Sequence, residues 1–463
     1  MSELAGKVAL VTGGSRGIGA AIAQRLARGP RPRGTSTGRR LGVTAAVALA
    51  LASAAGLCAW GTAAPATAAG RQPATGHDPV LISATPIARL SERSVAAELR
   101  NARLGPGDPA LGAGAVRYGI VAYRVLYRTV DAAGQPTRAS GLVAFPTSRA
   151  RELQLVDYGH GTTAYKLGVP SSFGLDANRD GLEGRWSSEL FASAGFAVAE
   201  PDYIGMGAGP GRPQYMVASA EVSASLDLLR AATVIAHRRG DRLAADVLVT
   251  GFSQGGAAAM AIGHALQQGS LPGFRLRALA PVSGPYDLLG AQLPGIFNGQ
   301  VAAAIAPYYV GYTLTAWNPL YHLYPAPQAA FRQPYAASVA GLFNGTHPDL
   351  QIIAALPSQL RNLLTARYLH LLQHPTGALK AALIRNSACT GWTPRAPVRL
   401  YAASGDTTVT QVNARHCRHA IRTRHGHVRL VQLGAVSHNV SDFLALPKIV
   451  RWFQAFRPGG AGA

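Results

Sequence analysis

The stretch Val247-Leu-Val-Thr-Gly-Phe-Ser253-Gln-Gly-Gly256 decides the fold of this chain. It starts with a run of apolar, mostly β-branched residues, which is typical of a buried strand, and it leads into an alanine-rich segment with helical character. Between the two, Ser253 has Gly251 and Gly255 two residues away on either side. Such a sharp turn exposes the serine hydroxyl beside the amide groups of a helix N-terminus. The stretch therefore predicts a nucleophilic serine.

The Gly-x-Ser-x-Gly pattern alone is weak evidence, because this glycine-rich chain contains it three times. The copy around Ser36 lies in an Arg/Pro/Gly-rich segment without a preceding strand. The copy around Ser15 does follow a strand-like run, but it belongs to a different motif that is described below. Only Ser253 combines the strand, the helix and suitable partners further along the chain.

Two later residues complete a catalytic pattern with Ser253. Asp406 follows the apolar run PVRLYAAS, and His438 follows the strand-like run HVRLVQLG, so each is expected just beyond the carboxyl end of a strand. A serine hydroxyl needs a base to take its proton, and that base needs a carboxylate that fixes its tautomer and stabilises the imidazolium. An α/β-hydrolase carries these residues in the order serine, acid, histidine. We therefore predict that Ser253, Asp406 and His438 are the catalytic residues.

A fourth element would stabilise the charge that develops on a substrate carbonyl oxygen. The apolar run 153–158 leads into His160-Gly161-Thr162, where the second backbone donor of this fold is expected, after its third strand. The first donor would be the N–H of Gln254, and the second would be the N–H of Gly161 or Thr162. Because the catalytic pattern already contains a histidine, we expect His160 to shape this loop.

Five stretches, taken in order, resemble the bacterial relatives of the secretory lipases, a family of α/β-hydrolase esterases: YGHGT, PDYIGMGAGPGRPQY, GFSQGG, SGDTTV and GAVSH. The resemblance covers roughly residues 85–457. It implies Ser253 as nucleophile, Asp406 as acid, His438 as base, and the oxyanion loop named above. The pair Asp202-Tyr203 matches a family stretch that lines the site, and we assign it no chemical role.

The predicted fold class is α/β, of the α/β-hydrolase type, with a mostly parallel central sheet flanked by helices and a helical cap insertion. Strands are expected near 118–127, 139–146, 153–158, 195–200, 246–250, 277–283, 397–403 and 427–433. Helices are expected near 216–238, 254–268, 410–422 and 440–455.

The domain boundaries follow from these elements. The hydrolase core would comprise residues 113–283 and 397–457, preceded by an N-terminal arm over residues 69–112. Residues 284–396 lack clear strands and carry helical patterns, so we expect a helical cap. The cap is rich in tyrosine, leucine and phenylalanine, as an apolar acyl or aryl substrate would need.

The first residues carry a different motif. Residues 6–29 resemble the first strand, glycine turn and helix of the short-chain dehydrogenase/reductase family, with Gly13, Gly17 and Gly19 in the turn. No second strand with an acidic ribose-binding residue follows, and none of the sixteen tyrosines has a lysine four residues on. One βα unit cannot bury its own sheet. We interpret residues 1–30 as a fusion fragment or a misassigned gene start and expect no cofactor; an NAD(P)-dependent oxidoreductase is the alternative.

Residues 31–68 have the features of an export signal. The pair Arg39-Arg40 precedes an uncharged apolar run over residues 41–60, and Ala66-Thr-Ala68 offers a small-x-small cleavage site. We therefore expect a secreted protein. The alternative is a retained membrane anchor, because the run over residues 41–60 is just long enough to span a bilayer.

The three cysteines fit an exported protein. Cys58 would leave with the signal, and Cys389 and Cys417 remain as an even pair on either side of Asp406. A disulfide between them would fix the loop and helix around the catalytic acid. Two buried thiols are the alternative.

The net charge of +22 would ordinarily suggest an anionic partner. The basic residues are scattered, however, and no lysine or arginine block has interleaved aromatic residues, so we expect no nucleic-acid binding. A weak attraction to anionic cell surfaces remains open, and we expect a monomer.

One polar segment has the opening of a calcium-binding loop. Asp176, Asn178 and Asp180 are followed by a glycine at the sixth position, but the twelfth position is Ser187 where a glutamate is needed. Glu183 or Glu189 would have to substitute. We therefore predict a polar turn and no metal, with calcium as the alternative.

Together these observations predict a secreted serine esterase or lipase that forms an acyl-enzyme, with a small-molecule or lipid ester as substrate. Apolar residues make up 48 % of the chain, which is enough for a large core. A secreted peptidase of the same fold is one alternative, because the same three residues and a helical cap serve aminopeptidases. A non-catalytic surface-binding protein on a hydrolase scaffold is another.

Overall fold

The computed structural model describes residues 80–174 and 181–457. Three predicted features lie outside these residues: the dehydrogenase-like fragment at 6–29, the export signal at 31–68 and the calcium-like segment at 176–180.

The described residues form a nine-stranded sheet in the order β1-β2-β3-β5-β4-β6-β7-β8-β9. The strands are β1 (Leu81–Leu90), β2 (Ile120–Val130), β3 (Pro136–Pro146), β4 (Glu152–Gly159), β5 (Ala197–Pro201), β6 (Arg242–Phe252), β7 (Arg275–Val282), β8 (Val398–Ala402) and β9 (Val428–Gln432). Pairing is antiparallel from β1 through β3 to β5 and parallel from β5 to β9. The predicted mostly parallel sheet is therefore confirmed.

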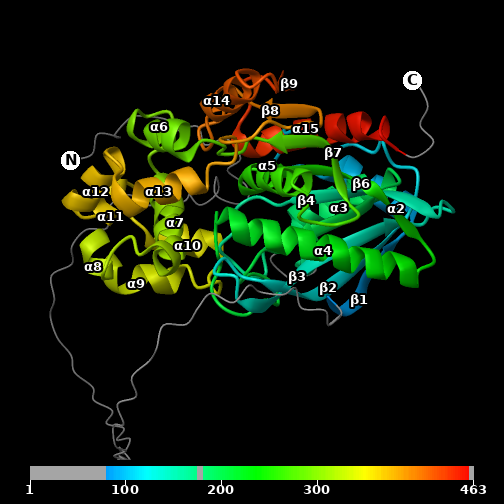
Figure 1. Cartoon of the computed structure of the whole chain (residues 1–463), viewed down its shortest axis with the longest axis horizontal. Helices are drawn as coiled ribbons and strands as arrows, with labels where there is room; N and C mark the ends of the chain where they lie inside the picture. Colours follow the sequence, from blue (N-terminus) through cyan, green and yellow to red (C-terminus); the bar gives the residue numbers. More distant parts are fainter. Residues whose placement is uncertain (1–79, 175–180, 458–463) are drawn as a thin grey trace, which may run out of the picture. The chain divides into compact units, whose positions relative to one another are not determined.

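Helices cover both faces of this sheet (Figure 1). One face packs against α4 (Ala218–Arg238), α5 (Gln254–Gln267) and α14 (Gln411–Arg422), and the other packs against α2 (Glu92–Asn101), α3 (Leu182–Ser193) and α15 (His438–Gln454). The central strands are buried on both sides, which explains why β4 to β7 read as nearly continuous apolar runs.

The N-terminal part of the described chain differs from the arm expected over residues 69–112. β1 pairs antiparallel with β2 along its whole length and is an edge strand of the sheet. α2 follows it, with Ser91 as N-cap and with Val95 and Leu99 buried against the core. The sequence did not predict β1, because most of its residues are partly or fully exposed and it therefore lacks the apolar run of a central strand.

The segment between β7 and β8 is helical. Its helices are η2 (Leu288–Gln292), α6 (Leu293–Phe297), α7 (Ala306–Tyr321), α8 (Pro327–Ala330), α9 (Tyr335–Leu342), α10 (Asp349–Ala355), α11 (Leu360–Leu363), α12 (Ala366–Gln373) and α13 (Gly377–Arg385). Trp317 of α7 donates to the carbonyl of Tyr215, and Asp349 of α10 accepts from the amide of Ala164. These contacts hold the helices over the loops that follow β4 and β5 (Figure 1).

A disulfide joins Cys389, which follows α13, to Cys417 of α14. Both cysteines are buried. The bond joins the end of the helical region to the helix that follows Asp406, so it closes a loop around this residue.

Breaking this disulfide is expected to lower stability. Closing a loop of 28 residues reduces the entropy of the unfolded chain by roughly 3 to 4 kcal/mol. Cys389→Ser with Cys417→Ser should therefore lower the free energy of unfolding in urea by up to that amount. Wild-type protein treated with a reductant should match the double variant, and a reduced protein as stable as the oxidised one would contradict the prediction.

Candidate active site

Ser253 occupies a strained turn between β6 and α5. Its φ of 56° and ψ of −116° lie in a region that residues with a side chain rarely adopt. The turn also brings backbones into close contact: a Cβ on Gly255 would lie 1.9 Å from the carbonyl oxygen of Gly159, and one on Gly251 would lie 2.4 Å from that of Gly255. The two glycines of the motif are therefore required by this packing.

The three predicted catalytic side chains meet at one point. The Ser253 hydroxyl lies 2.8 Å from His438 Nε2, and His438 Nδ1 lies 2.7 Å from Asp406 Oδ2. The tautomer with hydrogen on Nδ1 satisfies both contacts, with Ser253 donating to Nε2 and Nδ1 donating to Asp406. All three side chains are buried. This arrangement is the one needed to pass the serine proton to an oriented base.

The acid and the base are both held by their own segments. Asp406 Oδ1 accepts the amides of Thr408 and Val409 at 2.8 and 2.9 Å, which leaves Oδ2 for the histidine. His438 is the first residue of α15, and its ring packs on Phe252 with centroids 4.6 Å apart. The loops after β8 and β9 thus fix the orientation of both side chains.

The oxyanion loop after β4 differs in one respect from the sequence-based expectation. The N–H of Gly161 donates to Glu183 Oε1 at 2.7 Å, so this amide points away from a substrate. Among the residues that the structure describes, the amides of Thr162 and Gln254 have no hydrogen-bond partner. Both residues line the pocket that contains Ser253. Of the two alternatives, the Thr162 amide is therefore free to donate, whereas the Gly161 amide is already bonded to Glu183.

His160 fixes the loop from the other side. Its ring is buried and stacks on Tyr203 with centroids 4.4 Å apart, and burial lowers its pKa to about 4, so it is neutral at pH 7. Its Nδ1 lies 2.7 Å from the carbonyl oxygen of Gly161 and donates to it. His160 therefore holds the Gly161 carbonyl group and shapes the loop.

The sequence gave no role at this site to two glutamates near it, the partly buried Glu183 and the buried Glu221. Glu183 bonds Gly161, and Glu221 of α4 accepts from the side-chain amide of Gln254 at 2.8 Å. Burial raises the pKa of Glu221 to about 7. The sequence suggested Glu183 only as a substitute calcium ligand, Glu221 lies in no motif, and α3, which carries Glu183, was itself not predicted. The sequence contained no signal that could have identified them.

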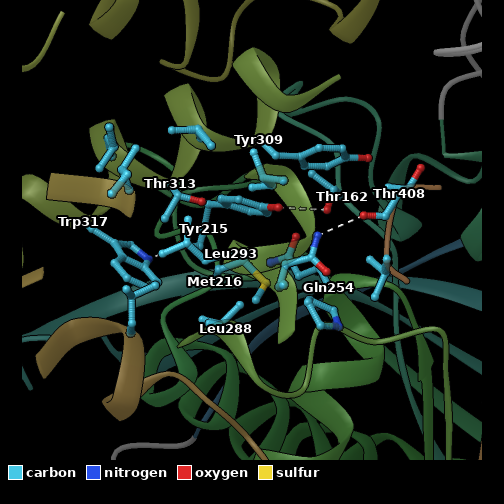
Figure 2. A pocket seen from close by; sticks show the side chains of 18 of the residues that line it. Thr162, Tyr215, Met216, Gln254, Leu288, Leu293, Tyr309, Thr313, Trp317 and Thr408 are labelled. Atoms are coloured by element: carbon cyan, nitrogen blue, oxygen red, sulfur yellow. Dashed lines mark hydrogen bonds between the residues drawn. The ribbon is translucent and has the colours of Figure 1, made fainter. Parts of the chain in front are cut away.

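A pocket opens beside Ser253 and is lined in part by helices of the region between β7 and β8 (Figure 2). The volume of its cavity is about 100 Å³. Trp317 and Thr408 lie at opposite sides of it in Figure 2. The lining consists of Thr162, Tyr215, Met216, Ser253, Gln254, Pro285, Leu288, Gln292, Leu293, Ile296, Tyr309, Val310, Thr313, Leu314, Trp317, Leu372, Leu379, Leu383, Thr408 and Val409. These residues are apolar or neutral.

The described residues contain no cluster of three or more potential metal ligands. Glu189 pairs with Arg185 and Ser187 donates to Glu200, while Glu183 is engaged with Gly161. The three residues considered for the end of a calcium loop thus have protein partners.

Comparison with known proteins agrees with this geometry. The model of the secretory lipase family matches residues 188–459. A protein of Legionella pneumophila has a similar structure, with a TM-score of 0.73 and 22 % identity, over 83 % of this chain and 100 % of its own. The rice cell wall degrading esterase LipA of Xanthomonas oryzae matches with a TM-score of 0.69 and 24 % identity over 81 % and 97 %. Candida antarctica lipase A in its closed state matches with a TM-score of 0.59 and 14 % identity over 83 % of each chain. No curated protein sequence matches.

The sheet, its helical layers and the three side chains at strand ends define an α/β-hydrolase. The family match covers more than half of the chain, so the chain belongs to the secretory lipase family. The protein is accordingly a hydrolase that cleaves carboxylic esters. The dehydrogenase-like residues 6–29 lie outside both the family match and the described structure.

Gly255→Ala should disrupt the elbow. The added Cβ cannot stay 1.9 Å from the Gly159 oxygen, so β4 and α5 must separate. We expect a stability loss above about 2 kcal/mol and at least a roughly hundredfold lower kcat on an aryl ester.

The matched control is Gly341→Ala in α9, where an added Cβ meets nothing within 4 Å. This variant should keep the wild-type kcat and gain up to about 1 kcal/mol. Thermal unfolding and ester hydrolysis measure both effects, and equal behaviour of the two variants would refute the packing argument.

Proposed function

We propose that the protein is a secreted serine esterase or lipase that works through an acyl-enzyme at Ser253. His438 takes the proton of the serine hydroxyl as the oxygen attacks the ester carbonyl carbon, and it then gives that proton to the leaving alcohol. A water molecule, activated by His438 in the same way, releases the acid. The two hydrogen bonds that join Ser253, His438 and Asp406 carry the proposal.

The oxyanion hole in this proposal consists of two backbone amides. Gln254 follows the nucleophile at the start of α5, and Thr162 follows the fixed residue Gly161 in the loop after β4. Donors held in place before the reaction stabilise the tetrahedral oxyanion without having to reorganise. The side-chain bond from Gln254 to Glu221 supports the first donor by restraining its residue.

The pocket supports an ester with an apolar acyl group as substrate. Its lining includes leucine, isoleucine, methionine and tryptophan side chains and contains no charged residue among those described. An aminopeptidase needs a carboxylate to hold the ammonium group of its substrate, because an unpaired charge is costly to bury. The lining therefore favours an ester over an aminoacyl amide. We further propose that the helical region 284–396 acts as the cap that closes this pocket.

Membership of a secretory family implies secretion. Within the residues that the structure describes, no helix is long and apolar enough to cross a bilayer. We propose that the enzyme acts as a monomer and that its strong positive charge gives a weak, salt-sensitive attraction to anionic cell surfaces.

Ser253→Ala should abolish ester hydrolysis and leave the fold intact. Loss of a nucleophile costs several orders of magnitude in kcat, because the remaining groups cannot form the acyl-enzyme. The control is Ser225→Ala in α4, which removes another buried serine hydroxyl that has no partner. A fluorophosphonate probe should label the wild type and the control at Ser253 and leave Ser253→Ala unlabelled. Labelling at another serine would redirect the assignment.

Thr313→Phe should narrow the pocket and shorten the preferred acyl chain. Thr313 of α7 lines the pocket, whereas Thr315 on the same helix does not. We expect Thr313→Phe to lower kcat/KM for p-nitrophenyl octanoate at least about tenfold relative to the acetate, since the long chain loses its space. The control Thr315→Phe should leave this ratio unchanged. Equal ratios in all three proteins would mean that the acyl chain binds elsewhere.

A further inference from the structure

Two carboxyl side chains and a tyrosine lie directly behind the oxyanion loop. Glu183 comes from α3, Asp442 from α15 and Tyr158 from β4. The Tyr158 hydroxyl lies 3.0 Å from Glu183 Oε1 and 3.4 Å from Asp442 Oδ2. The same Glu183 oxygen accepts the N–H of Gly161. Three elements of the core thus converge on one peptide group of the loop.

Burial disfavours the ionised forms of the carboxyl groups in this cluster. Burial raises the pKa of Glu183 above its usual range and raises that of Asp442 well above it, and each charge would oppose the other. The remaining titratable groups that face Glu183 are His438 of α15, which favours its charge, and Glu200 of β5, which opposes it. Burial and the neighbouring carboxyl group both favour the protonated form of Asp442, which reduces the repulsion between the two carboxyl groups.

The contacts around Gly161 determine where the next amide points. Glu183 holds the N–H of Gly161, and His160 holds its carbonyl oxygen. In a trans peptide the C=O of one residue and the N–H of the next point in opposite directions. Because the Gly161 oxygen is directed at His160, the N–H of Thr162 is directed to the opposite side. Thr162 lines the pocket together with Ser253.

The close approach of Glu183 also explains the glycine in the loop. A Cβ on Gly161 would lie 3.0 Å from Glu183 Oε2 and 3.0 Å from Cδ1 of Phe252, which packs on His438. A side chain at this position would push the loop away from the carboxyl group. The backbone of Gly161 therefore fits between Glu183 and the residue before the nucleophile.

We propose that Glu183 is a positioning residue for the oxyanion hole. Its carboxyl group accepts the Gly161 N–H and is itself held by the Tyr158 hydroxyl, which lies beside Asp442. Through Gly161 it directs the Thr162 N–H toward the reacting carbonyl. The inference rests on the proposed function, because it assumes acyl transfer at Ser253. It assigns Glu183 no contact with the substrate.

The test compares Glu183→Ala with Glu183→Gln on a p-nitrophenyl ester. The alanine variant loses the acceptor, so kcat should fall about ten- to hundredfold while KM changes less than about threefold, since the oxyanion forms only in the transition state. The glutamine variant keeps an acceptor oxygen of the same reach, and its kcat should lie within about fivefold of the wild type. Glu189→Gln is the matched control, because Glu189 is a buried glutamate on the same helix that pairs with Arg185; its kcat should be unchanged.

Tyr158→Phe provides a second variant that removes only one hydroxyl. It leaves Glu183 without that support, and kcat should fall about three- to tenfold at an unchanged KM. Near-wild-type kcat in both Glu183→Ala and Tyr158→Phe would overturn the proposal. A glutamine variant as impaired as the alanine variant would overturn it too, because it would show that charge, and not the acceptor, matters.

A fluorophosphonate probe separates this inference from the proposed function. The proposal expects labelling at Ser253 in every variant, with a labelling rate that falls in parallel with kcat in Glu183→Ala. If the probe labels Ser253 while Glu183→Ala reacts at the wild-type rate, only the role of Glu183 fails. If Ser253 is not labelled in the wild type, the proposed function fails, and the role of Glu183 fails with it.

Discussion

The close backbone contact between the elbow and β4 is the constraint on which the site depends. Gly159 at the end of β4 pairs with Gly251 near the end of β6, and Gly255 at the start of α5 rests on the Gly159 oxygen. The nucleophile follows one of these neighbouring parallel strands, and the oxyanion loop follows the other. Any side chain at the contact would separate them. The glycines therefore set the distance between the Ser253 hydroxyl and the loop after β4 that we propose for the oxyanion hole.

The site also requires a set of buried polar groups that hold the proposed catalytic acid and the residues of the oxyanion hole in place. Asp406 is fixed by two amides of its own loop, Gln254 by Glu221, and Gly161 by Glu183. Burial raises the pKa of both glutamates, so their ionised forms weaken the fold, and that loss of stability grows as pH rises through the raised pKa values. Well-packed apolar residues would be more favourable for folding alone. The benefit of the buried polar groups is that the site is already arranged before substrate arrives.

The sequence predicted the strands β2 to β9 and selected three residues whose side chains meet in the structure, because each of these predictions depends on a local pattern. Apolar runs identify buried strands, and Asp406 and His438 follow such runs in the order that the fold requires. β1 and α3 were missed, since an exposed edge strand and a helix that buries several serines lack a clear apolar period. The partner of Gly161 was missed for a related reason: Glu183 lies 22 residues away on that unpredicted helix, and only the packing of α3 on β4 brings the two together.

A crystal structure of the protein after reaction with an alkyl phosphonate tests the central claim most directly, because the adduct carries an oxygen where the tetrahedral oxyanion would lie. We expect the phosphorus to be bonded to Ser253 Oγ, and its free oxygen to lie within hydrogen-bond distance of the amides of Gln254 and Thr162. The Gly161 amide should remain on Glu183, and the alkyl chain should lie in the pocket beneath α7. A phosphonate on another residue, or an oxygen bound by the Gly161 amide after that amide has left Glu183, would contradict the account.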